Sequence, residues 1–112
     1  MKRWPGRAWR IVAAETAISK NGIPIRLTDE RWNHVSEEHT ELSAMRTHVQ
    51  ETVSGPDRVF QGYGGELLAA KQVELGKWLA VVYRELDADG FVITAFLTRR
   101  IASLEKRRQV WP

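Results

Sequence analysis

The chain has 112 residues, a length that allows one domain and leaves no room for a second core. Its 43% hydrophobic and 28% charged residues are typical of a water-soluble globular protein. Seventeen Lys and Arg residues against 14 Asp and Glu residues give a net charge of +3, which is too small to identify a nucleic-acid partner by itself. Because the sequence has no cysteine, disulfide scaffolds, thiolate nucleophiles and cysteine-type zinc sites are excluded.

The charge is unevenly distributed along the chain. Residues 1–27 are basic, residues 28–66 are acidic, and residues 67–112 are again basic. We therefore expect a single domain over 1–112, with a basic N-terminal arm (1–22) and a basic C-terminal tail (100–112). No segment approaches the roughly 20 apolar residues of a membrane helix, and the N-terminus lacks the apolar region of a signal peptide, so we expect a cytoplasmic protein.

The N-terminal third predicts a β-hairpin followed by two helices. Asn21-Gly22 lies between two segments of strand character and predicts the turn of a hairpin, because both residues tolerate positive φ. Pro24 predicts that the second strand lies at a sheet edge. Thr28 is a good N-cap for a helix over 29–39. A second helix is expected over 42–53, where apolar residues recur at steps of three and four.

From Pro56 onward, the apolar period becomes two. It predicts strands at 58–61, 67–73, 79–86 and 91–98, joined by short connections that require antiparallel neighbours. The fold class expected is therefore α+β, with a hairpin or strand and two helices before an antiparallel sheet of about four strands. The stretch 101–110 is expected to form a basic terminal helix.

The last hairpin predicts which side chains share a sheet face. A symmetric turn at 87–90 places Tyr83 opposite Thr94, so these two polar groups lie on one face. The other face, which holds Ala80, Val82 and Arg84, is largely apolar and is expected to meet the helices. Lys71 cannot be assigned to a face, because its connection allows more than one register.

Two histidines are candidates for proton transfer. His34 and His39 diverge by about 140° on an ideal helix and converge only if the helix ends near Glu38. Imidazoles near a Tyr and a Thr are suitable for RNA cleavage, in which one group deprotonates the 2′-OH and another protonates the leaving oxygen. No metal or other cofactor is required.

Two other readings are open for these histidines. His34 and Glu38, with His39 or His48 as a third ligand, could hold zinc, although the pattern lacks the second His of HExxH. Alternatively, the histidines are incidental surface residues of a noncatalytic module that binds nucleic acid or protein through its basic ends.

Several motifs occur in a recognisable order. They are RLTDERWNH ending at His34, EHTE over 38–41, SGPDRV over 54–59, KWLAVVY over 77–83 and GFVITAFLT over 90–98. Over residues 25–99, this set resembles the phage-associated nucleases of the barnase, EndoU, colicin and RelE-like superfamily. Where the family pattern reads His-Pro-Glu, this chain has His39-Thr40-Glu41.

The resemblance implies a small metal-independent ribonuclease, phage-associated or toxin-like, whose antiparallel sheet carries the active site. It implies an RNA substrate and, in toxin-like members, a cognate inhibitor or antitoxin protein. His34 and His39 correspond to the paired histidines of the family, and Thr94 lies in its GFVITAFLT-like strand. The expected catalytic groups are His34, His39, Thr94 and Tyr83, and the expected phosphate contacts are Arg58, Lys71, Arg84 and Arg99.

Overall fold

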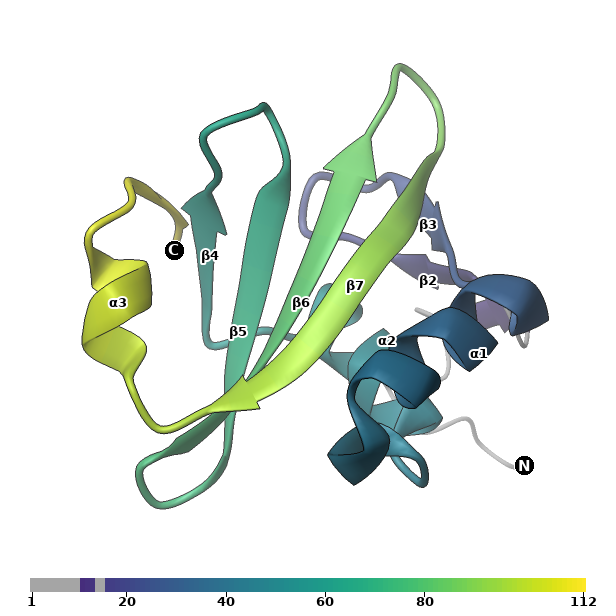
Figure 1. The fold of residues 1–112 in the computed structure, drawn as a ribbon. Coiled ribbons are helices and arrows are strands. Elements are labelled where there is room, and N and C mark those ends of the chain that lie inside the picture. The colour runs from purple at the N-terminus through teal and green to yellow at the C-terminus, as the bar shows by residue number, and fades with distance from the viewer. Residues whose placement is uncertain (1–10, 14–15) are drawn as a thin grey trace, which may run out of the picture.

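The computed structural model describes residues 11–13 and 16–112 and has an α+β architecture (Figure 1). One mostly antiparallel sheet has the strand order β1-β2-β3-β7-β6-β5-β4-β8. Its strands are β1 (Ile11–Ala13), β2 (Thr16–Ile18), β3 (Pro24–Arg26), β4 (Arg58–Gln61), β5 (Leu67–Glu74), β6 (Lys77–Glu85), β7 (Gly90–Thr98) and β8 (Gln109–Trp111). The helices are α1 (Asp29–Glu38), the short 3-10 helix η2 (Thr40–Leu42), α2 (Arg46–Ser54) and α3 (Ile101–Glu105).

The predicted N-terminal hairpin is confirmed as β2 and β3. Its turn contains Gly22 at φ +82°, a conformation that favours glycine. The edge position predicted for the second strand is wrong, because β3 lies between β2 and β7. Pro24 fits there because it is the first residue of its strand, and the parallel pairing of β3 with β7 starts one residue later, at Ile25.

The predicted arm 1–22 is only partly covered by the described residues. Residues 11–13 and 16–18 are strands of the sheet rather than a separate arm. The basic side chains expected near the start of the chain, at Lys2, Arg3, Arg7 and Arg10, lie outside the described residues.

The first predicted helix begins where its cap was expected. The hydroxyl of Thr28 accepts a hydrogen bond from the Arg31 amide at 3.1 Å, and two acidic residues occupy the first turn. The second predicted helix is divided into η2 and α2. Arg46, at the start of α2, donates to Asp29 at 2.6 Å and to the Leu27 carbonyl at 2.9 Å, which joins the beginnings of the two helices. No helix in the described part of the chain is long and apolar enough to cross a membrane.

The four predicted C-terminal strands are confirmed and form the centre of the sheet as β4 to β7. The predicted terminal helix is wrong in its second half. The chain forms the short helix α3 and then turns back as β8, which pairs antiparallel with β4. Because β8 protects the edge of β4, the last residues complete the sheet instead of leaving a free strand edge.

The sheet buries side chains on both faces. One face of the sheet packs against α1, η2 and α2 and is called the α2 face. Its buried residues include Ala69, Leu79, Val81, Tyr83, Val92 and Ala95. The α3 face carries Phe60, Leu68, Ala70, Trp78, Ala80, Val82 and Phe96, of which Val82 and Phe96 are only partly buried. Leu104 of α3 covers one end of this face.

The predicted register of the last hairpin is wrong, and so is its assignment of faces. Thr94 pairs with Val82 rather than with Tyr83. The pairing of β6 with β7 shifts by one residue at this point, because Tyr83 pairs with Val92. Thr94 and Tyr83 therefore lie on opposite faces of the sheet. The helices α1 and α2 meet the face that holds Tyr83, whereas the prediction had them meet the face that holds Val82.

Candidate functional site

His39 lies where α1 ends and the chain turns into η2. Its amide donates to the Val35 carbonyl at 2.9 Å, which closes the last turn of α1. The side chain then reaches toward β7, where its ring centroid is 6.4 Å from that of Phe96 at an interplanar angle of 40°. About a third of the side chain stays exposed, so the imidazole contacts Phe96 and is still accessible to solvent.

An acidic residue contacts the same imidazole. Nδ1 of His39 lies 3.8 Å from Oε2 of Glu41, which is itself in η2. At this distance the carboxylate is near the Nδ1 side of the ring but does not accept a hydrogen bond from it. The site thus combines a partly exposed imidazole with a neighbouring carboxylate.

Thr94 belongs to the strand that His39 contacts. It lies on the α3 face, two residues before Phe96, since its partner Val82 is on that face. The residue is partly exposed, but its hydroxyl oxygen is buried and has no hydrogen-bond partner in the described part of the chain. An unpaired buried hydroxyl is costly, so this oxygen is a candidate to bond a polar ligand.

Two of the expected phosphate contacts lie on this same face. Arg84 donates to the Gly64 carbonyl at 3.0 Å and lies 3.9 Å from Glu66. Arg58 pairs with Glu105 of α3 at 2.6 Å and stacks over Trp78 at 5.4 Å from its centroid. Both guanidinium groups are partly exposed and could bind an anion, but only in competition with their carboxylate partners.

Tyr83 does not join this group of residues. It is 1% exposed and packs in the α2 face, on the other side of the sheet from Thr94. Burial raises the pKa of its hydroxyl well above the usual value, and the nearby charge of Glu85 raises it further. A phenol that is neutral and covered on all sides is a core residue rather than a polar group of the site.

His34 lies on an exposed part of α1. Within the described residues it forms no hydrogen bond, ion pair or ring contact, and it does not touch His39. The condition for convergence is met, since α1 ends at Glu38 and His39 is its cap. The structure nevertheless brings only His39 against the sheet.

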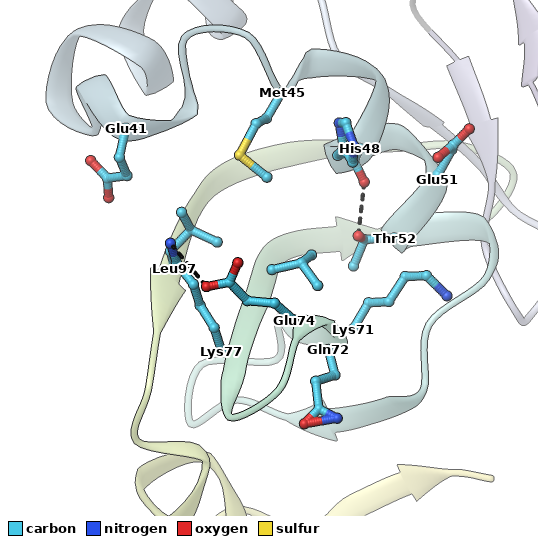
Figure 2. Close-up of a pocket in the computed structure, with 11 residues that line it drawn as sticks. Glu41, Met45, His48, Glu51, Thr52, Lys71, Gln72, Glu74, Lys77 and Leu97 are labelled. Carbon is cyan, nitrogen blue, oxygen red and sulfur yellow. Dashed lines mark hydrogen bonds and ion pairs between the residues drawn. The ribbon is translucent and has the colours of Figure 1, made fainter.

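Lys71 lies on the α2 face, in a groove of about 500 Å³ between α2 and the end of the β5–β6 hairpin (Figure 2). Its ammonium donates to the Gly55 carbonyl at 3.2 Å. His48, Met45 and Leu97 line the same groove. Lys71 is therefore separated by the sheet from Thr94 and from the other expected phosphate contacts on β4 and β6.

Arg99 lies just beyond the end of β7 and is exposed. It pairs with Glu74 at 3.2 Å and lines a shallow hollow of about 460 Å³ with Arg100 and Lys106. Residues 99–108 hold five Lys and Arg residues and one acid, Glu105. The predicted basic tail is thus a basic surface along α3 and the turn into β8.

No group of three or more His, Asp and Glu residues in 11–13 and 16–112 is arranged to hold a metal ion. The structure therefore does not bring His34, Glu38 and His39 or His48, all of which are described, together as a metal site. His48 lies in α2 and lines the groove of Lys71, which Glu41 also lines.

Two residues of the site are not among those that the sequence predicts. Phe96 is the surface on which His39 packs, and Glu41 is its acidic neighbour. Glu41 had a signal in the sequence, because an acid two residues after a histidine lies within reach across a turn. Phe96 had none, because its contact with His39 depends on how α1 crosses the edge of β7.

Comparisons with family models, with curated proteins and with solved structures found no match to this chain.

Proposed function

We propose that this chain is a metal-independent ribonuclease-like domain, similar in arrangement to the barnase, EndoU, colicin and RelE-like nucleases, that cleaves RNA on its α3 face. The observation that carries the proposal is His39, a partly exposed imidazole held between Phe96 on the sheet and the carboxylate of Glu41. The α+β order of helices before an antiparallel sheet is compatible with that arrangement.

The chemistry requires two proton transfers and charge stabilisation. A base removes the proton of the ribose 2′-OH, the oxygen attacks phosphorus, and an acid protonates the 5′-oxygen as its bond to phosphorus breaks. The products are a 2′,3′-cyclic phosphate and a free 5′-OH. Imidazole is the side chain best matched to both transfers near neutral pH. His39 supplies one transfer, and we assign the other to His34, the imidazole five residues earlier on α1.

Charge on the phosphorus oxygens grows during the reaction and needs donors that are already in place. Arg84 supplies a guanidinium on the face that carries Thr94, and the Thr94 hydroxyl supplies a neutral donor. The RNA substrate and an inhibitor or antitoxin partner both belong to this proposal.

The test is cleavage of mixed cellular RNA by the purified protein in EDTA, with the ends of the products analysed. Wild type is expected to leave 2′,3′-cyclic phosphates. His39→Ala is expected to lose about 100-fold or more in rate, the contribution of a general acid or base. His34→Ala is expected to lose a similar factor if it performs the second transfer.

His48→Ala is the matched control, because it removes an imidazole that lines the groove of Lys71 on the α2 face, whereas His39 contacts Phe96 of the α3 face. It is expected to cleave at the wild-type rate. Equal cleavage by the His39 and His48 variants, or no cleavage by folded wild type, would refute the assignment of His39.

The basic surface of residues 99–108 favours a second candidate function, a noncatalytic module that binds nucleic acid. Five cations on one short segment suit a phosphate backbone whether or not cleavage follows. Salt-sensitive RNA binding by a protein that leaves RNA intact, with no effect of His39→Ala, would identify this second function.

A further inference from the structure

Tyr63 is a large aromatic side chain that is 80% exposed. It lies in the loop between β4 and β5, next to the ends of the two strands. A ring so exposed contributes little to the core, and its flat apolar face is available for stacking.

The loop that carries Tyr63 is well ordered by hydrogen bonds. Gly62 and Gly64 donate through their amides to the carbonyl and the side chain of Glu66, at 2.7 and 2.9 Å. Arg84 donates to the Gly64 carbonyl at 3.0 Å, and Gly65 has φ +91°, which only glycine adopts without strain. The ring is thus presented from a fixed backbone rather than from a loose loop.

A cation stacks on one side of this ring. Cζ of Arg107 lies 4.8 Å from the ring centroid, and its guanidinium also donates to the Ser103 carbonyl of α3 at 3.3 Å. The neighbouring Lys106 and Arg108 are exposed, and the Arg108 carbonyl accepts from the Gln61 amide, which joins the basic segment to β4. The basic surface and the exposed ring therefore form one continuous surface.

We propose that Tyr63 and Arg107 form a stacking platform for an unpaired base of the RNA strand, with Lys106 and Arg108 binding the adjacent phosphates. Aromatic rings stack on bases of any sequence, guanidinium planes do the same, and neighbouring cations hold the backbone. A duplex keeps its bases stacked inside, so the platform favours single strands. RNA as the occupant rests on the proposed function.

The platform is connected to the proposed cleavage site through Arg84. This side chain bonds the Tyr63 loop and belongs to the face that carries Thr94. A strand held at Tyr63 continues onto the α3 face, where His39 lies over Phe96. The platform thus contributes to binding and orientation, while the proton transfers remain with the histidines.

The test measures binding separately from cleavage. The probe is a short fluorescein-labelled 2′-O-methyl oligoribonucleotide, which lacks the 2′-OH nucleophile and cannot be cleaved, and anisotropy gives its dissociation constant. Tyr63→Leu is expected to weaken binding by about 5-fold to 100-fold, the range for loss of one base stack. Tyr63→Phe keeps the ring and is expected to bind like wild type.

Leu75→Ala is the matched control, because it removes a 91% exposed apolar side chain from the β5–β6 turn. It is expected to leave binding unchanged. An abasic strand of the same length is expected to bind wild type and Tyr63→Leu equally, because only the base contact is lost. Circular dichroism checks that every variant is folded.

The outcomes separate the two proposals. Binding that depends on Tyr63 in a protein that does not cleave RNA supports the platform and refutes the nuclease. Binding that is unchanged in Tyr63→Leu, or weakened equally for the abasic strand, refutes the platform whatever the cleavage result. Tighter, Tyr63-dependent binding of the corresponding DNA strand would assign the platform to DNA and overturn the RNA assignment.

Discussion

At the scale of single residues, the position of His39 follows from the end of a helix. On a continuous helix, His39 would point about 140° away from His34, and neither direction is set by the sequence pattern alone. The end of α1 at Glu38 gives His39 a non-helical backbone with φ −130° and ψ 78°. This conformation directs the ring toward β7. The candidate site is therefore built by the helix terminus rather than by a helix face.

The role expected for Tyr83 leads to a prediction at the residue scale. Because the folded protein raises the pKa of this phenol above its ordinary value of 10.0, the unfolded chain loses its proton at a lower pH than the folded chain does. Unfolded chains then bind fewer protons, so stability is full below pH 10 and falls as the pH rises above it.

Tyr83→Phe removes this titration. The difference in unfolding free energy between wild type and variant is expected to be constant from pH 7 to about pH 10 and then to shift in favour of the variant at higher pH. Urea unfolding of both proteins at a series of pH values measures this difference in free energy. Parallel curves throughout the alkaline range would show that the Tyr83 hydroxyl is not buried in the fold.

At the scale of elements, most strands and helices could be predicted because each depends on local signals. The Asn21-Gly22 turn, the Thr28 cap and the alternating pattern of 58–98 are all local. The strand β8 could not be predicted, because Gln109–Trp111 is too short to show a period and is a strand only through its pairing with β4.

The prediction of which side chains share a face of the last hairpin was wrong for a different reason. The turn occupies 86–89 rather than 87–90, as the pairing of Glu85 with Gly90 shows, and this shift alone would move the register by two and keep every face. The irregularity next to Val82 then adds one residue to β7. A single extra residue transfers Thr94 and Phe96 to the α3 face, and nothing in the sequence marks it.

The N-cap of α1 gives a prediction at the element scale. Thr28→Ala removes the oxygen that accepts from the Arg31 amide, so the free energy of unfolding is expected to fall by about 1 kcal/mol. Thr28→Ser retains a hydroxyl and should recover most of this loss. Chemical denaturation compares the three proteins. Equal stability of the Ala and Ser variants would mean that the cap does not stabilise α1 in solution.

At the scale of the whole molecule, one sheet supports two separate groups of buried side chains. The α2 face contains most of the core, while the α3 face is covered at one end by Leu104 and left partly open near Phe96. The ends of the sheet also contact each other, because the ammonium of Lys20 in the first hairpin turn lies 4.5 Å from the ring centroid of Trp111 in β8. The last strand is thus linked to the first hairpin.

This arrangement predicts cooperative unfolding of both faces. Leu104→Ala and Leu42→Ala each remove a buried side chain, one from each face, and each is expected to lower stability by about 2–5 kcal/mol. Since both faces share the same strands, each variant should still show a single transition, in which Trp fluorescence and far-UV circular dichroism coincide. If α3 and β8 instead formed an independent lid, Leu104→Ala would split the two signals, with fluorescence changing at lower denaturant. The contact between Arg107 and Tyr63, on which the proposed platform depends, would then be lost before the fold that carries His39.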